Sequence, residues 1–231
     1  MKIQGSTALV TGANRGIGAA LVRALQQAGA RTIYAAARTP DAAGGDGVVP
    51  LRLDVTRQDT IDAAAAQARD VTLVINNAGI LLPSAALGPD AERAFLDQAE
   101  VNVLGPVRVT RAFAPLLAAN GGGAVVNIHS ALSWITMGAT AAYSASKAAA
   151  WAFTNGMRQE LRAQGTQVLG VHFGYVDTDM THGVSAPKSS PEDIAAQILA
   201  AVERGDAELL ADDVSRQLRR SFGSETPAYL A

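Results

Sequence analysis

An α/β fold, with one doubly wound parallel sheet and helices on both of its faces, is the class that this sequence predicts. Two observations predict it. Short runs of β-branched residues alternate with longer alanine-rich stretches through most of the 231 residues, which indicates strands joined by helical crossovers. The runs are apolar without in-and-out alternation, which is typical of strands covered on both faces. We therefore expect a single domain over residues 1–231, with about seven strands.

The strands are expected where the apolar runs lie. They cover residues 7–11, 32–34, 48–53, 71–75, 124–128 and 167–173. A last strand and a tail are expected within the C-terminal stretch 207–231. The loop at 39–47 is rich in glycine but too short to link two domains, so we interpret it as a connection within one domain.

Helices are expected between these strands. Residues 16–28 place apolar side chains on one face at helical spacing. Thr56 and Asp59 resemble a capping box that begins a helix ending at Arg69. Ser190 and Pro191 have the residue types of an N-cap and a first helical position. Two longer helices, at about 89–119 and 142–164, flank the strand at 124–128.

Composition excludes several classes of protein. The chain has no cysteine, so it has no disulfide, thiolate nucleophile or thiolate zinc site. A net charge of −2 argues against a nucleic-acid surface. No leader and no apolar run long enough to cross a bilayer is found, so we expect a cytoplasmic protein away from membranes. The three histidines lack ligand-like spacing, so we expect no metal site; His129 and His172 are expected to be packed or hydrogen-bonded.

A glycine-rich turn directly follows the first strand. It reads Thr-Gly-Ala-Asn-Arg-Gly-Ile-Gly over residues 11–18 and opens the first helix. Glycines at 12, 16 and 18 allow a tight turn and let the backbone approach a pyrophosphate at the helix N-terminus. A purely structural turn is the alternative. The strand before it and the helix after it favour nucleotide binding.

The spacing Gly-x-x-x-Gly-x-Gly resembles that of the short-chain dehydrogenase/reductase family, and further motifs follow in the family's order. They are Leu53-Asp54-Val55, Asn76-Asn77-Ala78-Gly79, Val101-Asn102-Val103, Ser130, Tyr143-x-x-x-Lys147 and Gly174-Tyr175-Val176-Asp177-Thr178. The resemblance runs from about residue 6 to residue 200. It implies a single-domain Rossmann-type fold and a carbonyl–alcohol oxidoreductase that uses a nicotinamide cofactor.

The resemblance also implies roles for individual residues. The catalytic residues would be Asn102, Ser130, Tyr143 and Lys147. The cofactor-binding residues would be Gly12, Asn14, Arg15, Gly16, Ile17, Gly18, Arg38, Asp54, Val55, Asn77, Ala78, Gly79, Tyr143, Lys147, Gly174, Val176 and Thr178. Asn102 would position a water that links Lys147 to solvent. Lys147 would also hold the nicotinamide ribose.

The end of the second strand favours NADP(H) over NAD(H). In nicotinamide enzymes of this general fold an acid there binds the ribose 2′-hydroxyl, whereas arginine accommodates a 2′-phosphate. The strand here ends Ala35-Ala36-Ala37-Arg38, without an acid, and Arg15 is a second cation near the loop. Two solvated arginines are the alternative interpretation.

Tyr143 and Lys147 are one helical turn apart, so their side chains face the same site. A nearby lysine cation favours the phenolate, so we expect the pKa of Tyr143 to fall toward the working range. The phenol would then exchange a proton with the substrate oxygen, which Ser130 would orient. An ordinary surface pair of tyrosine and lysine is the alternative.

The substrate is expected to be an apolar ketone or aldehyde. The pocket wall is expected to comprise Leu81, Leu82, Ala131, Leu132, Trp134, Tyr175 and Met180. The substrate loop at 180–190 is short, which favours an open and permissive pocket. Phe173 replaces the proline that the family usually has before the glycine, so we expect a less fixed backbone there.

The two long helices are rich in apolar and small residues, and in the family they form a dimer interface. We expect a homodimer or homotetramer through 89–119 and 142–164, although core packing alone would also explain them. Two other functions stay open. One is a non-catalytic dinucleotide-binding sensor or scaffold, and the other is an epimerase or dehydratase on the same fold, which usually needs a longer C-terminal region.

Overall fold

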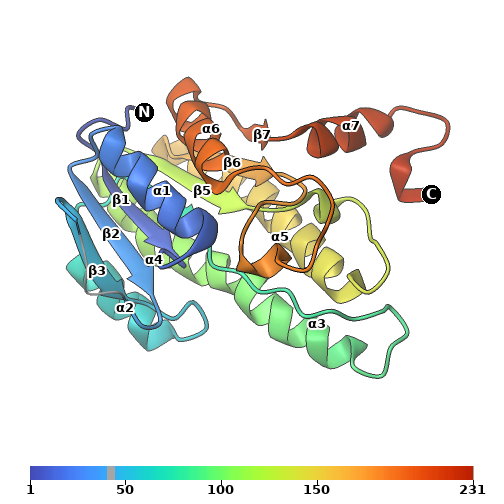
Figure 1. The fold of residues 1–231 in the computed structure, drawn as a ribbon. Coiled ribbons are helices and arrows are strands. Elements are labelled where there is room, and N and C mark those ends of the chain that lie inside the picture. The colour runs from blue at the N-terminus through green and yellow to red at the C-terminus, as the bar shows by residue number, and fades with distance from the viewer. Residues whose placement is uncertain (41–44, 231) are drawn as a thin grey trace.

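The computed structural model describes residues 1–40 and 45–230. Its sheet has seven parallel strands in the order β3-β2-β1-β4-β5-β6-β7 (Figure 1). The strands are β1 (Thr7–Thr11), β2 (Thr32–Ala37), β3 (Val48–Arg52), β4 (Leu73–Asn76), β5 (Ala124–Ile128), β6 (Gln167–His172) and β7 (Glu208–Leu210). The chain therefore has the doubly wound α/β fold that the sequence predicts.

Within residues 1–40 and 45–230, seven α-helices connect and extend these strands. They are α1 (Gly16–Gln27), α2 (Gln58–Gln67), α3 (Ala91–Ala99), α4 (Gly105–Ala119), α5 (Ala141–Glu160), α6 (Pro191–Arg204) and α7 (Asp213–Ser221). The predicted helix at 89–119 is thus α3 and α4, joined without a break by a π-helical turn over Glu100–Leu104. The predicted helix at 142–164 is α5, followed by a 3₁₀ turn over Leu161–Gln164.

The hydrophobic core lies on both faces of the sheet. On one face α1 and α6 pack against the strands, with Leu21 and Ile198 among their fully buried side chains. On the other face α2 and α4 do so, with Ile61 and Phe113 fully buried. Because both faces are covered, β1, β4 and β5 are buried along their whole lengths.

One predicted helix start is wrong. Helix α2 begins at Gln58 after Arg57, and no side chain caps it. The Thr56 hydroxyl instead donates to the Asp54 carboxylate at 2.7 Å. Arg57 occupies the N-cap position, so Thr56 lies one residue too early to cap the helix. The predicted start at Ser190 is confirmed, since its hydroxyl accepts a hydrogen bond from the Asp193 amide.

The strand order reverses direction between β1 and β4, which places a crevice at their carboxyl ends. The chain then ends in an arm, residues 211–230, that follows β7, includes α7 and extends beyond the sheet (Figure 1). Part of the predicted connection at 39–47, residues 41–44, lies outside the described residues. Among the helices that the structure describes, none has the length and apolarity needed to cross a membrane.

Candidate active site

The glycine-rich turn lies at the carboxyl end of β1 and leads directly into α1. Gly12 and Gly16 have φ values of +66° and +53°, a region that side chains disfavour. A Cβ at Gly18 would lie 2.0 Å from the Gly12 carbonyl oxygen. Close backbone packing therefore requires glycine at position 18, and positive φ favours it at the other two.

The end of β4 holds this turn in place. The Asn77 side-chain amide donates to the carbonyl oxygens of Thr11 and Gly12, at 2.9 and 3.2 Å. The Thr11 hydroxyl accepts from the backbone amides of Asn77 and Ala78, at 3.0 and 3.1 Å. Asn77 thus has a structural task here, because its side-chain amide fixes the two neighbouring loops to each other.

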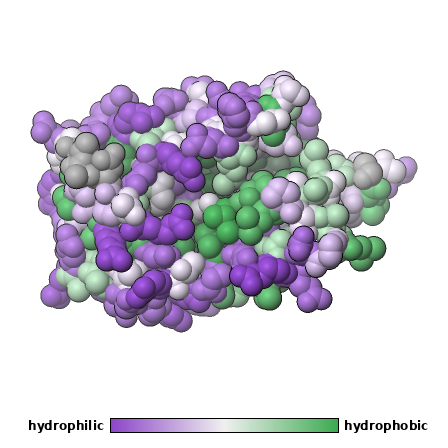
Figure 2. Space-filling view, turned by 60° about the horizontal axis from the view of Figure 1, so that its bottom comes forward, coloured by the Kyte–Doolittle hydropathy of each residue, from purple (hydrophilic) through white to green (hydrophobic). Residues whose placement is uncertain are grey.

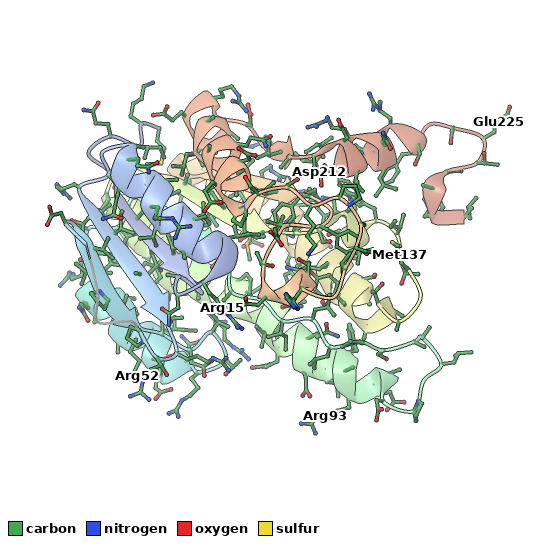
Figure 3. The ribbon with its side chains drawn as sticks, in the orientation of Figure 1. Arg15, Arg52, Arg93, Met137, Asp212 and Glu225 are labelled. Carbon is green, nitrogen blue, oxygen red and sulfur yellow. The ribbon has the colours of Figure 1, made fainter. Side chains whose placement is uncertain are left out.

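Charged and polar residues surround this crevice. Arg15 lies beside the N-terminal end of α1 and forms an exposed ion pair with Asp179 at 3.2 Å (Figure 3). The Asn14 side chain donates to the Thr39 carbonyl oxygen. Burial acts to raise the pKa of Asp54, but hydrogen bonds from Thr56 and the charges of Arg38 and Arg57 outweigh it and lower that pKa. Arg38 and Asp54 therefore interact electrostatically at one side of the crevice.

The predicted catalytic side chains come together beside the glycine turn. Tyr143 and Lys147 lie in the first two turns of α5, and both are buried. The Lys147 ammonium lies 5.7 Å from the centre of the Tyr143 ring and donates to the Ile128 carbonyl oxygen at 2.9 Å. The phenol of Tyr143 interacts with the Ser130 hydroxyl, which lies just beyond β5. Gly79 borders the lysine, since a Cβ there would lie 3.8 Å from the ammonium nitrogen.

The protonation of this pair differs from the prediction. Burial raises the pKa of Tyr143 to about 12, although the hydrogen bond with Ser130 acts in the opposite direction. Burial also lowers the pKa of Lys147 to about 8. Loss of water outweighs that hydrogen bond, so the phenol keeps its proton at neutral pH. The lysine cation loses its proton more easily than that of an exposed lysine.

Asn102 lies in the π-helical turn and is buried. Its side-chain nitrogen donates to the Ile80 carbonyl oxygen and the Ser146 hydroxyl, at 2.9 and 3.1 Å. Its side-chain oxygen accepts from the Ile80 amide at 2.9 Å. The amide therefore anchors the backbone at Ile80 to α5, and its role in holding a water stays a prediction.

Comparisons with known proteins agree with this geometry. The family model described as short chain dehydrogenase matches residues 6–189. The chain belongs to the short-chain dehydrogenase family.

Individual relatives of this short-chain dehydrogenase align along most of its length. The 1-deoxy-11-beta-hydroxypentalenate dehydrogenase of Streptomyces avermitilis is 33% identical, and the alignment covers 97% of this chain and 84% of that protein. The ketoacyl reductase HetN of Nostoc sp. is 32% identical over 90% of this chain and 79% of that protein. A short chain dehydrogenase from Burkholderia cenocepacia, solved in complex with NADP, has a TM-score of 0.93 and 37% identity, covering 97% of this chain and 95% of that one. This family places the chain among oxidoreductases.

In this short-chain dehydrogenase, the backbone after β6 is held more firmly than the missing proline led us to expect. The Asp212 carboxylate accepts a hydrogen bond from the Gly174 amide at 2.6 Å and another from the Ser215 amide at 2.8 Å (Figure 3). Asp212 thus fixes the backbone that lacks the usual proline at Phe173. Sequence reasoning missed this residue, and its only local signal is the N-cap pattern Asp212-x-x-Ser215.

The rest of the segment lies against the glycine turn. A Cβ at Gly16 would lie 3.1 Å from a methyl carbon of Thr178. Val176 is buried and pairs with Ser189 in an isolated bridge, which joins the two ends of the predicted substrate loop. Two of the predicted cofactor residues, Ile17 and Val55, have packed side chains, so only their backbone atoms are free to contact a cofactor. Ile17 packs against the core, and the Val55 side chain packs against Gly105 of α4.

The predicted pocket residues differ in how exposed their side chains are. Leu82 and Met180 are exposed beside the crevice, and Leu81, Leu132 and Tyr175 are half-buried there. Ala131 is buried. Trp134 belongs to an aromatic cluster below the crevice, because its indole stacks on the His172 ring at 4.1 Å and meets Phe222 edge-on. The indole is therefore packed among aromatic rings, and the role of these residues as a pocket wall stays a prediction.

Proposed function

We propose that this short-chain dehydrogenase interconverts an apolar ketone or aldehyde and the corresponding alcohol, with NADP(H) as cofactor. The observation that carries the proposal is the buried group of Ser130, Tyr143 and Lys147 beside a glycine turn that leads into a helix. A sensor without catalytic function would not need a buried lysine within 5.7 Å of a buried phenol, since burying such polar groups is costly.

The residues around the crevice fit a dinucleotide. Gly12 and Gly16 carry no side chain, and α1 begins directly after the turn that they form. Arg15 and Arg38 would hold the 2′-phosphate, and Lys147 and the Gly174–Thr178 segment would hold the nicotinamide end. The Burkholderia cenocepacia relative was solved with NADP. The cofactor supplies the hydride when it is bound.

The protein's own residues supply the proton and the orientation. The Ser130 hydroxyl accepts a hydrogen bond from the Leu132 amide at 3.1 Å, which leaves its proton to be donated to a substrate carbonyl oxygen. Tyr143 is protonated at neutral pH and gives its proton to the same oxygen as the alcohol forms. The Lys147 cation stabilises the resulting phenolate.

The rate of carbonyl reduction is expected to fall above pH 8. Burial lowers the pKa of Lys147 to about 8, so the cation is present below that pH and is lost as the pH rises through it. We expect kcat/KM for reduction to fall about tenfold per pH unit in the alkaline limb. Rates between pH 6 and 10, with samples returned to pH 7 to exclude denaturation, measure this. A flat profile up to pH 10 would contradict it.

Replacing Arg38 by Asp is expected to shift the preference from NADP(H) toward NAD(H). The substitution removes a cation that faces the 2′-phosphate and adds an acid that binds a 2′-hydroxyl. We expect KM for NADPH to rise about tenfold or more, at a cost of 1–2 kcal/mol for one charged hydrogen bond, and KM for NADH to fall. Arg52→Asp, an exposed arginine at the end of β3, is the matched control. If Arg38→Asp leaves KM for NADPH and KM for NADH unchanged, Arg38 does not set the preference for NADP(H).

A panel of carbonyl compounds tests the reaction class. NADPH absorbance is followed with apolar ketones, aromatic aldehydes, sugars and keto acids. Turnover of several apolar carbonyls is expected, since Leu82 and Met180 are exposed at the crevice and the substrate loop, 180–190, is short. Tight NADPH binding without turnover of any carbonyl would favour the sensor function instead.

We also propose that the enzyme is a cytoplasmic homodimer or homotetramer. Figure 2 shows an apolar patch enclosed by hydrophilic residues on the face turned forward from the bottom of Figure 1. Exposed apolar side chains from the helices that we expect to associate include Phe95, Leu96, Leu104 and Phe153. Burying such side chains against a second copy would be favourable. The molar mass in solution tests this assembly.

A further inference from the structure

A buried histidine lies directly against the backbone of Ser130. His172 ends β6, and its side chain is fully buried. Its Nδ1 atom lies 3.2 Å from the Ser130 carbonyl oxygen. Because a carbonyl oxygen only accepts hydrogen bonds, this contact is favourable when Nδ1 carries the proton.

The surroundings of Nε2, the other ring nitrogen of His172, also agree with a proton on Nδ1. Nε2 of His172 has no hydrogen-bond partner among the described residues. Glu208 Oε1 lies 3.6 Å away, beyond hydrogen-bond length, and Oε2 of the same carboxylate faces Arg219 at 3.4 Å. Burial lowers the pKa of His172 to about 4, so the ring carries one proton at neutral pH. That proton belongs on Nδ1, where an acceptor is present.

Aromatic neighbours fix the orientation of the ring. The Trp134 indole stacks on it, with centroids 4.1 Å apart and planes 19° from parallel. Trp151 meets it edge-on at 6.3 Å, and the His129 ring lies 5.0 Å away. A ring packed in this way cannot turn without disturbing its neighbours, so its N–H has a fixed direction.

The backbone donors to Ser130 are local. The Ser133 amide donates to the same carbonyl oxygen at 3.0 Å, and the Leu132 amide donates to the hydroxyl oxygen. Both donors belong to the turn that Ser130 itself begins. The bond from His172 comes from β6 instead, and beside it the Ala131 amide ties the same turn to the Phe173 carbonyl oxygen, just after β6, at 2.8 Å.

We propose that His172 is a positioning residue for catalysis, whose Nδ1–H holds the Ser130 carbonyl and thereby directs the Ser130 hydroxyl toward the substrate oxygen. This inference rests on the proposed function, in which Ser130 orients the substrate. Small errors in such an orientation are costly, since displacement of a reacting group by about 1 Å lowers rates by about a hundredfold.

Two substitutions of His172 test the proposal. His172→Leu removes the donor and keeps an apolar side chain, and we expect kcat for carbonyl reduction to fall by about tenfold to a hundredfold. KM and Kd for NADPH are expected to stay within about twofold, because the serine does not hold the dinucleotide. His172→Asn places an amide N–H near the position of Nδ1, so we expect it to restore kcat to within about threefold of the parent.

His129→Leu is the matched control. His129 directly follows β5 and is also buried beside His172, but neither of its ring nitrogens has a hydrogen-bond partner among the described residues. We expect this variant to keep kcat within about twofold, since no hydrogen bond is lost. If His172→Leu keeps the parent kcat, or if Asn fails to restore it, His172 does not position Ser130.

Two further results separate this inference from the proposed function. If the parent turns over carbonyls and Tyr143→Phe abolishes turnover, but His172→Leu has no effect, only the inference fails. If the parent turns over no carbonyl, both fail. The ¹⁵N chemical shifts of the His172 ring give a readout that does not depend on activity. A protonated Nδ1 supports the inference, and a protonated Nε2 overturns it.

Discussion

Tyr143→Phe is expected to lower kcat for carbonyl reduction by about a hundredfold to ten-thousandfold, the usual range for losing a general acid. In the proposed mechanism the phenol is the proton donor beside Ser130, and burial raises its pKa to about 12. Phenylalanine keeps the ring and its packing but has no proton to give. Single-turnover rates with NADPH, together with NADPH affinity from its fluorescence, measure the effect.

Tyr143→Phe is expected to bind NADPH as tightly as the parent. Unchanged affinity would show that the variant is folded and that the loss of activity comes from the missing proton donor. Tyr229→Phe removes the same hydroxyl from an exposed ring in the C-terminal arm, far along the chain from α5. That variant is expected to keep kcat within about twofold. If Tyr143→Phe retains more than a tenth of the parent kcat, a different group supplies the proton.

Gly18→Ala is expected to have the second large effect. The added Cβ would lie 2.0 Å from the Gly12 carbonyl oxygen and 2.7 Å from the Asn77 side-chain nitrogen. The first of these atoms is backbone, so the glycine turn itself must move. We expect a loss of about 3 kcal/mol or more in unfolding free energy, or about a hundredfold in NADPH affinity.

The control for this substitution is Gly156→Ala. Gly156 lies within α5, and a Cβ there would have no neighbour within 4 Å. Alanine favours a helix by up to about 1 kcal/mol over glycine, so this variant should be as stable as the parent or slightly more stable. Thermal unfolding and NADPH titration of both variants check the prediction. If Gly18→Ala and Gly156→Ala have the same unfolding temperature and the same NADPH affinity, the turn tolerates a side chain at position 18.

The sequence predicts the fold well because the sheet is buried on both faces. Strands such as Thr7–Thr11 and Ala124–Ile128 are mostly apolar, are buried along their lengths and have the predicted bounds. The helix at Ser190 is predicted correctly because its capping chemistry is local. The proximity of Tyr143 and Lys147 is also local information, because helical periodicity sets which side chains share a face.

Other features depend on contacts that local pattern does not contain. Thr56 does not cap α2 because the helix begins one residue later than the pattern predicts, while the Thr56 hydroxyl donates to the Asp54 carboxylate. The pKa of Tyr143 depends on how deeply α5 is buried, which no spacing reveals. Trp134 packs on His172, a residue 38 positions later in the sequence, only because β5 and β6 are neighbours. Each of these outcomes is decided by a neighbour in space.

The contact between Asp212 and Gly174 has a consequence for how the enzyme opens locally. One carboxylate begins α7 and also holds the backbone after β6, where a proline ring would have restrained the backbone by covalent geometry. A hydrogen bond gives that restraint only while α7 is folded. We therefore expect the C-terminal helix and the segment around Gly174 to open together, so that unfolding of the first turn of α7 loosens the backbone at Gly174.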